Sequence, residues 1–226
     1  MSMIRIKPAE SDLKPYLQAT YFIDCDHPRI KKAARQLTGS LSEAKMMAKA
    51  IFLFVRDEIR YNPYSFSTSR KNYQAHTILA RGKGYCIQKA ILLAALCRAA
   101  GIPTRLRLAN IRNHQVPAKL AEMMKTDIFY CHGYNEIYLD DRWLKATPTF
   151  DRFMCERLEI NPVNFDGNQD AVFDQHSRDG RLHIEYLKQW EAFPDLPFTE
   201  IMTTFNDNYG KDMIQRWITA GKQHDD

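Results

Sequence analysis

The chain of 226 residues lacks the features that mark most metal-binding, disulfide-bonded and membrane proteins. Its five cysteines are an odd number and form no CxxC pair, which argues against both a zinc site and a disulfide framework. No apolar run reaches membrane-spanning length, and residues 1–16 form no apolar signal segment. Internal repeats and low-complexity segments are absent. We therefore expect a reduced, cytoplasmic protein that needs no metal or other cofactor.

The charge of the chain does not indicate a nucleic-acid partner. Lys and Arg outnumber Asp and Glu by 32 to 27, but the basic residues are scattered along the sequence. No run is dense enough to predict binding to nucleic acid, and no acidic cluster demands calcium. The 45% of hydrophobic residues suffices for one globular core. Neither a nucleic acid nor a membrane is therefore expected as a partner.

Residues 82–108 read as a loop with two glycines, a cysteine, a buried helix and a strand. Apolar residues follow Cys86 at helical spacing, and Gly101 and Pro103 mark the end of that helix. Cys86 is thus placed in the first turn, where unpaired N–H groups and the helix dipole favour a thiolate. The thiolate is the nucleophilic form of cysteine. The alternative is that Cys86 is a small buried residue without a chemical role.

Residues 130–151 read as a hairpin that carries a second set of polar groups. Alternation predicts one strand with His132, Tyr134 and Glu136 on the same face, followed by a turn at residues 140–141 and a returning strand that ends before Thr147. A nucleophilic cysteine needs a nearby base and a group that orients the base. The order of cysteine on a helix, histidine on a strand and a polar group on the next strand is that of papain-like enzymes.

The ordered set of motifs resembles the transglutaminase-like superfamily, including its bacterial cysteine-protease members. The resemblance covers roughly residues 45–150, and FVRDEIRYNP at 54–63 resembles the helix that precedes the core in bacterial members. It implies an α+β, papain-like fold in which the cysteine helix packs on an antiparallel sheet. The residues that carry it are Gly84-Tyr85-Cys86, ALCRAAGIPTR at 95–105, His132 with Glu136 and Tyr138, and Trp143.

By this resemblance Cys86 is the nucleophile and His132 is the base that later acts as general acid. The third family position, usually Asp followed by Pro, falls on Thr147 before Pro148. A threonine hydroxyl can accept a hydrogen bond from the imidazole but brings no charge, so the Cys–His ion pair should be weaker than with Asp. Asp151 and Glu136 are alternative partners for His132.

Three functions are compatible with these residues. The first is cysteine-dependent acyl transfer on amide or peptide bonds, as in a protease, an amidase or a transglutaminase, with a peptide or protein substrate. The second is a non-catalytic module that binds a peptide or partner, in which Thr147 marks lost chemistry. The third, an arylamine acetyltransferase-like enzyme, fits less well because no coenzyme A-binding feature is present.

Three segments are expected within a single globular unit. Residues 1–41 form a lead-in and a short helix from Pro28, residues 42–151 the catalytic core, and residues 152–226 an extension packed on it. Further expectations are a capping box at Ser40 and Glu43, an irregular segment over 60–78, a short helix after Pro117 and a helix over 198–217. The remaining polar candidates are assigned surface or structural roles: His114, the pair His176 and His183, and the other four cysteines, Cys25, Cys97, Cys131 and Cys155.

Overall fold

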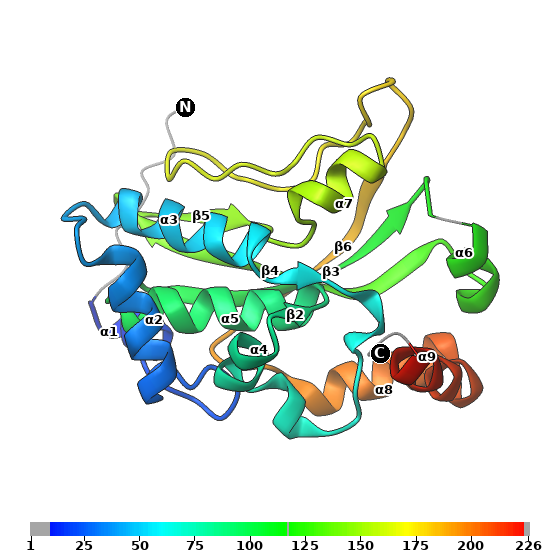
Figure 1. Ribbon diagram of the computed structural model, residues 1–226, viewed down its shortest axis with the longest axis horizontal. Helices are drawn as coiled ribbons and strands as arrows, with labels where there is room; N and C mark the ends of the chain where they lie inside the picture. The colour runs from blue at the N-terminus through cyan, green and yellow to red at the C-terminus, as the bar shows by residue number, and fades with distance from the viewer. Residues whose placement is uncertain (1–9, 117, 224–226) are drawn as a thin grey trace.

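The computed structural model describes residues 10–116 and 118–223, and a four-stranded antiparallel sheet lies at its centre (Figure 1). The strand order in this sheet is β5-β4-β3-β6. A separate parallel pair, β1 with β2, lies just before the cysteine helix. The strands are β1 (Arg60–Tyr61), β2 (Lys83–Gly84), β3 (Thr104–Asn113), β4 (Ile128–Leu139), β5 (Arg142–Ala146) and β6 (Ile184–Phe193).

Helix α5 (Cys86–Ala99) lies along one face of the sheet, as Figure 1 shows, and is the centre of the main hydrophobic core. Every residue from 87 to 98 is buried, which confirms the expectation of a helix buried on nearly all sides. It is covered by the sheet on one side and by three further helices on the other. Gly101 adopts a φ of 78° just beyond its end, as predicted. The covering helices are α2 (Pro28–Thr38), α3 (Ala44–Asp57) and α4 (Ala75–Arg81).

The opposite face of the sheet is covered by the chain between β5 and β6, which includes α7 (Arg152–Arg157) (Figure 1). A second, smaller core forms there around Tyr134, Phe173 and Ile184. The predicted alternation along β4 is confirmed, because Cys131 and Ile137 belong to the main core and Tyr134 to the smaller one. Helices and an antiparallel sheet combined in this way make the fold α+β, as the sequence predicted.

Two local expectations are wrong. Helix α3 begins at Ala44 with Glu43 itself as N-cap and without a side-chain cap, so the capping box with Ser40 does not form. The helix expected over 198–217 is two helices, α8 (Phe198–Tyr209) and α9 (Lys211–Gln223), because Gly210 between them adopts a φ of 78°. The short helix after Pro117 is present as α6 (Ala118–Met124), and α1 (Glu10–Leu13) lies in the lead-in. The first nine residues of the expected lead-in lie outside the described residues.

A buried arginine connects distant parts of the chain to the core. The Arg98 guanidinium donates to the carbonyl oxygens of Thr104 (2.9 Å), Gln18 (2.8 Å) and Pro194 (2.8 Å). One side chain at the end of α5 thus holds the N-terminal lead-in and the segment before α8 against the start of β3. The division into residues 1–41, 42–151 and 152–226 stays a prediction, and the main core draws on all three segments, from Phe22 to Phe205.

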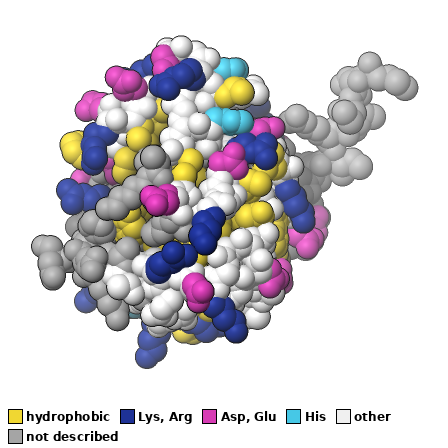
Figure 2. Space-filling model, turned by 90° about the vertical axis from the view of Figure 1, so that its right-hand side faces the viewer, with side chains coloured by type: hydrophobic (Ala, Val, Ile, Leu, Met, Phe, Trp, Pro, Cys, Tyr) yellow, Lys and Arg dark blue, Asp and Glu magenta, His cyan; other side chains and the backbone are white. Residues whose placement is uncertain are grey.

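Helices α6, α8 and α9 lie together at one end of the molecule (Figure 1). Viewed from that end, hydrophobic side chains form small patches between basic and acidic ones (Figure 2). Over residues 10–116 and 118–223, no helix combines the length and the apolar character needed to cross a membrane.

Candidate active site

Cys86 is the first residue of α5, preceded by Tyr85 as N-cap, and its side chain is partly exposed. Burial raises the pKa of the Cys86 thiol to about 11, although backbone hydrogen bonds from Gly133, Ile87 and Cys86 itself act to lower it. The helix start therefore supplies the expected N–H donors, but desolvation outweighs them. This pKa favours the neutral thiol over the thiolate that the position at a helix start alone predicts.

Gly133 on β4 allows the sheet to run unusually close to the first turn of α5. A Cβ atom at this position would lie 2.7 Å from the Cα and 3.1 Å from the backbone nitrogen of Ile87. Only glycine fits such an approach between two backbones. This contact brings the N–H of Gly133 to the Cys86 sulfur and places His132, its neighbour, beside the cysteine loop.

An irregularity in β4 immediately precedes His132. The pairing with β3 runs regularly to Ala109 opposite His132 and then shifts, so that Ile111 lies opposite Phe129. Cys131 has a φ of 57°, and its N–H donates to the Asn110 side-chain oxygen at 3.2 Å. A bulge of this kind redirects the side chains next to it, and bulges recur beside active sites.

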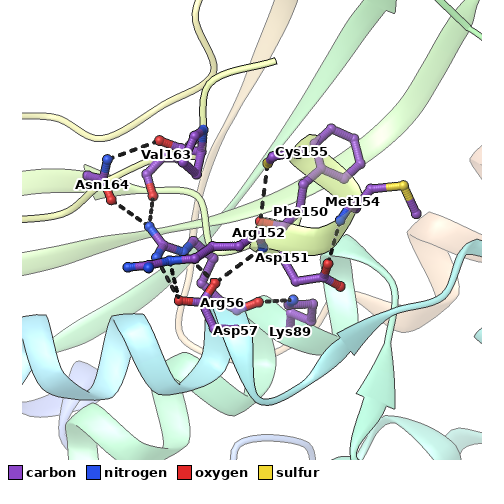
Figure 3. Close-up of polar contacts among 11 residues, drawn as sticks. Arg56, Asp57, Lys89, Phe150, Asp151, Arg152, Met154, Cys155, Val163 and Asn164 are labelled. Atoms are coloured by element: carbon purple, nitrogen blue, oxygen red, sulfur yellow. Dashed lines mark hydrogen bonds and ion pairs between the residues drawn. The ribbon is translucent and has the colours of Figure 1, made fainter. Parts of the chain in front are cut away.

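Lys89, one turn after Cys86, fixes α5 against the end of α3. Its buried ammonium donates to the carbonyl oxygens of Arg56 (2.9 Å) and Ile59 (2.6 Å). Burial lowers the pKa of Lys89 to about 7, opposed by the charges of Asp151 and Asp57. Figure 3 shows the contact between Lys89 and the Arg56 carbonyl, with Asp57 and the segment that begins at Phe150 close by.

Gln88 and Tyr85 tie the same helix start to the segment 60–78. The Gln88 side-chain oxygen accepts from the Tyr85 N–H at 3.2 Å, and its amide nitrogen donates to the carbonyls of Ser65 (3.1 Å) and Asn72 (3.2 Å). The hydroxyls of Tyr73 and Tyr85 are hydrogen-bonded at 3.0 Å. The segment thus holds the loop that carries Cys86 in place.

His132 is 3% exposed and packs among aromatic rings on the smaller core. Its ring centroid lies 5.2 Å from that of Phe173 and 6.4 Å from those of Tyr134 and Tyr186. Burial lowers the pKa of His132 to about 3, so its imidazole is neutral at pH 7. The buried Nε2 has no hydrogen-bond partner within the described residues.

The third predicted residue, Thr147, directly follows the end of β5 at Ala146. It is fully buried, and its N–H donates to the Ala171 carbonyl at 2.9 Å. The Thr147 hydroxyl forms no hydrogen bond of normal geometry to any described residue. Burial raises the pKa of Tyr186, and an interaction with the Thr147 side chain partly offsets that rise. Tyr186 in turn contacts the ring of His132, so a tyrosine from β6 lies near both predicted residues.

The two alternative partners of His132 are engaged elsewhere. Asp151 caps α7 by accepting from the Met154 N–H at 2.8 Å and also accepts from the Tyr61 N–H at 2.8 Å. Glu136 forms a salt bridge with Arg105 at 2.7 Å. Neither carboxylate is hydrogen-bonded to His132, so neither orients the imidazole in this structure.

Cys86 and His132 line one cavity of about 150 Å³ between the sheet, α7 and the two C-terminal helices. Thr149, which the sequence analysis did not single out, also lines it, and its hydroxyl is buried without a protein partner among the residues that the structure describes. The indole N–H of Trp217 donates to the Pro63 carbonyl at 2.8 Å and so holds α9 against the cavity wall. The extension thus supplies part of the site.

Of the other candidates from the sequence, Cys131 also lines this cavity, whereas the described lining includes none of the three histidines His114, His176 and His183. The imidazole of His114 is 3.2 Å from a Glu185 carboxylate oxygen. Burial lowers the pKa of His183, whose ring lies 6.2 Å from that of Phe173. His176 and His183 belong to no group of three or more potential ligands in the described part of the chain. The five cysteines are all free thiols.

The fold and this arrangement define an α+β protein of the papain-like class, with a cysteine at a helix N-terminus beside a strand histidine. Residues 31–148, slightly more than half of the chain, match the transglutaminase-like superfamily. The chain therefore belongs to the transglutaminase-like superfamily.

Similar solved structures are distant. A candidate cysteine protease from Cytophaga hutchinsonii has 16% sequence identity and a TM-score of 0.49, over 82% of this chain and 55% of that one. A candidate protease from Parabacteroides distasonis has 15% identity and a TM-score of 0.39, over 61% of this chain and 25% of that one. The chain thus spans about half of the first structure and a quarter of the second. No curated protein matches the chain.

Proposed function

We propose that the protein catalyses cysteine-dependent acyl transfer on amide or peptide bonds of a peptide or protein substrate. The observation that carries this proposal is that Cys86, at the first turn of α5, and His132 line the same cavity. Membership in the transglutaminase-like superfamily supports the same class of chemistry. Proteases and amidases pass the acyl group to water, whereas transglutaminases pass it to an amine.

The proposed reaction begins from a neutral pair. As the Cys86 sulfur bonds to the carbonyl carbon, His132 takes the thiol proton and then delivers it to the leaving amine, so that the C–N bond breaks and a thioester remains. Water or an amine then attacks the thioester, and the thiol is restored. The N–H of Cys86, at the helix start, would stabilise the oxyanion of each tetrahedral intermediate.

The pKa values near 11 for Cys86 and near 3 for His132 bear on the timing of this step. Both values favour the neutral forms, so an ion pair would not be formed before substrate binds. Proton transfer would accompany attack on the carbonyl, as it does with a serine nucleophile. An uncharged Thr147 fits this mode, because no carboxylate among the described lining residues would stabilise an imidazolium before the reaction begins.

The experiment is detection of an acyl-enzyme. Wild-type protein is incubated with activated amide and ester substrates, quenched in acid and mapped by mass spectrometry, with hydrolysis followed in parallel. We expect acylation on Cys86, loss of turnover in Cys86→Ser and in His132→Ala, and normal turnover in Cys25→Ala, which removes a buried thiol outside the cavity. Full activity of Cys86→Ser would refute the assignment.

The second candidate is a non-catalytic binding module. Its supporting observations are the neutral Cys86 thiol and the uncharged Thr147 in place of the usual aspartate. Alkylation rates of the five thiols against pH distinguish the two functions. If the accessible Cys86 reacts as an ordinary thiol whose rate is unchanged by His132→Ala, and no acyl-enzyme forms with any substrate, the binding module is the better description.

A further inference from the structure

The wall of the cavity beside Cys86 is largely apolar and aromatic. Among the described residues that form its wall there is no Asp, Glu, Lys or Arg. Aromatic rings come from both sides of the site: from the segment after β1, from the segment that covers the smaller core, and from the C-terminal helices. The principal ones are Tyr61, Phe66, Phe150, Phe173, Phe205 and Trp217.

The size of the cavity limits what can enter it. Its volume is about 150 Å³, and apolar protein cavities of about this volume stay dry and accept a benzene molecule. Cys86 and His132 form part of the cavity wall. When the carbonyl carbon of an acyl donor lies at the Cys86 sulfur, the donor's side chain therefore lies inside the cavity. There is room for one ring, or for a branched aliphatic side chain of similar size.

The polarity of the wall selects against other side chains. A carboxylate or ammonium would lose its hydration and meet no opposite charge. A second amide, as on a glutamine side chain, would need hydrogen-bond partners of its own. Two buried polar atoms on the wall have no partner among the described residues, His132 Nε2 and Thr149 Oγ1, and under the proposed function the reacting amide would engage them.

We infer that this cavity binds an uncharged, benzene-sized side chain of the acyl donor. The inference rests on the proposed function. It means that the preferred donors are amides of phenylalanine-like residues, and that glutamine and charged residues are poor donors. The protein would thus act on apolar positions in a peptide rather than on the side-chain amide of glutamine.

Binding without chemistry tests this inference. The full chain with Cys86→Ala is titrated with the N-acetyl methylamides of phenylalanine, glutamine, lysine and glutamate, and binding is followed by NMR. We expect the phenylalanine compound to bind at least about tenfold more tightly than each of the others, since one methylene in an apolar pocket already discriminates by this factor. Equal binding of the glutamine or lysine compound, or no binding of the phenylalanine compound, overturns the inference.

A filled cavity provides the matched control. In the same background Leu158→Trp places a larger side chain on the cavity wall, and Leu187→Trp makes the same change on exposed β6, away from the cavity. We expect the first to weaken binding of the phenylalanine compound at least about tenfold and the second to leave it unchanged. Equal affinity in a folded Leu158→Trp protein overturns the inference, and if that variant does not fold, the ligand panel decides.

Failure of the inference and failure of the proposed function are separable. Selective binding to Cys86→Ala without any acyl-enzyme in the wild type refutes the chemistry and supports the binding inference. An acyl-enzyme that forms as fast from glutamine or lysine donors as from phenylalanine donors supports the chemistry and refutes the binding inference.

Discussion

Replacing Gly133 by alanine tests the close contact between β4 and α5. The added Cβ would lie 2.7 Å from the Cα of Ile87, whereas carbon atoms pack favourably at about 3.5–4.0 Å. Strand and helix must therefore separate by roughly 0.8 Å. Overpacking of a core costs about 1–3 kcal/mol, and the upper end applies because backbone lies on both sides of the contact. We expect a loss of about 2–3 kcal/mol in the free energy of unfolding.

The same shift affects the proposed chemistry. His132 precedes Gly133 on the strand, and Cys86 precedes Ile87 on the helix, so the separation moves nucleophile and base apart. A misplacement of about 1 Å can cost about a hundredfold in rate. We expect kcat/KM of Gly133→Ala to fall by that order, while the protein still folds.

Urea unfolding at fixed pH, followed by fluorescence, gives the stability, and the acyl-transfer assay gives the rate. Gly180→Ala is the control, because its Cβ would meet nothing within 4 Å and only its φ of 81° is strained. That strain costs about 1–2 kcal/mol and should leave activity unchanged. If Gly133→Ala is within about 0.5 kcal/mol of wild type, the usual range of neutral substitutions, and is fully active, the argument from the contact is wrong.

Three further outcomes are expected. Lys89→Met leaves the buried carbonyls of Arg56 and Ile59 without a donor and should lower the free energy of unfolding by about 1–3 kcal/mol in urea titrations, and no loss would show that Lys89 does not anchor α5. The folded pKa of His132, about 3, lies below the unfolded value of about 6.5, so the unfolded state binds more protons between these values. The contribution of His132 to the free energy of unfolding should therefore be fully present above about pH 6.5 and decrease toward pH 3. In His132→Gln the free energy of unfolding should depend less steeply on pH over this range, and an identical dependence in both proteins would contradict a neutral, buried imidazole. Thr149→Val removes the unpartnered hydroxyl in the cavity and should lower kcat/KM about tenfold without loss of stability, and unchanged kinetics would remove Thr149 from the site.

Much of the fold could be predicted from local patterns. The spacing of apolar residues after Cys86 located α5, and alternation along residues 131–139 placed successive side chains on opposite faces of β4. Gly101 marked a helix end because a left-handed residue there favours glycine. These signals depend on neighbours in the sequence and are therefore readable from it.

The surroundings of the candidate site could not be read in this way. The sequence did not predict strand β6, because its residues do not alternate regularly between buried and exposed, and Leu187 and Lys188 in its middle are both exposed. Tyr186, which lies on this strand, was therefore not predicted to be near the site either. The steric need for Gly133 depends on a backbone 46 residues away in sequence, at Ile87. The helix start that favours a thiolate at Cys86 is visible in the sequence, whereas the burial that raises its pKa comes from the fold and is not.

The burial of Cys86 has a consequence for oxidative damage. With a pKa of about 11, only about one molecule in ten thousand carries the thiolate at pH 7. Peroxides oxidise the thiolate to sulfenic acid and then irreversibly to higher acids. Cys86 would therefore react more slowly with peroxides than cysteines of low pKa do, and a substrate or partner that lowers its pKa would also make it easier to oxidise.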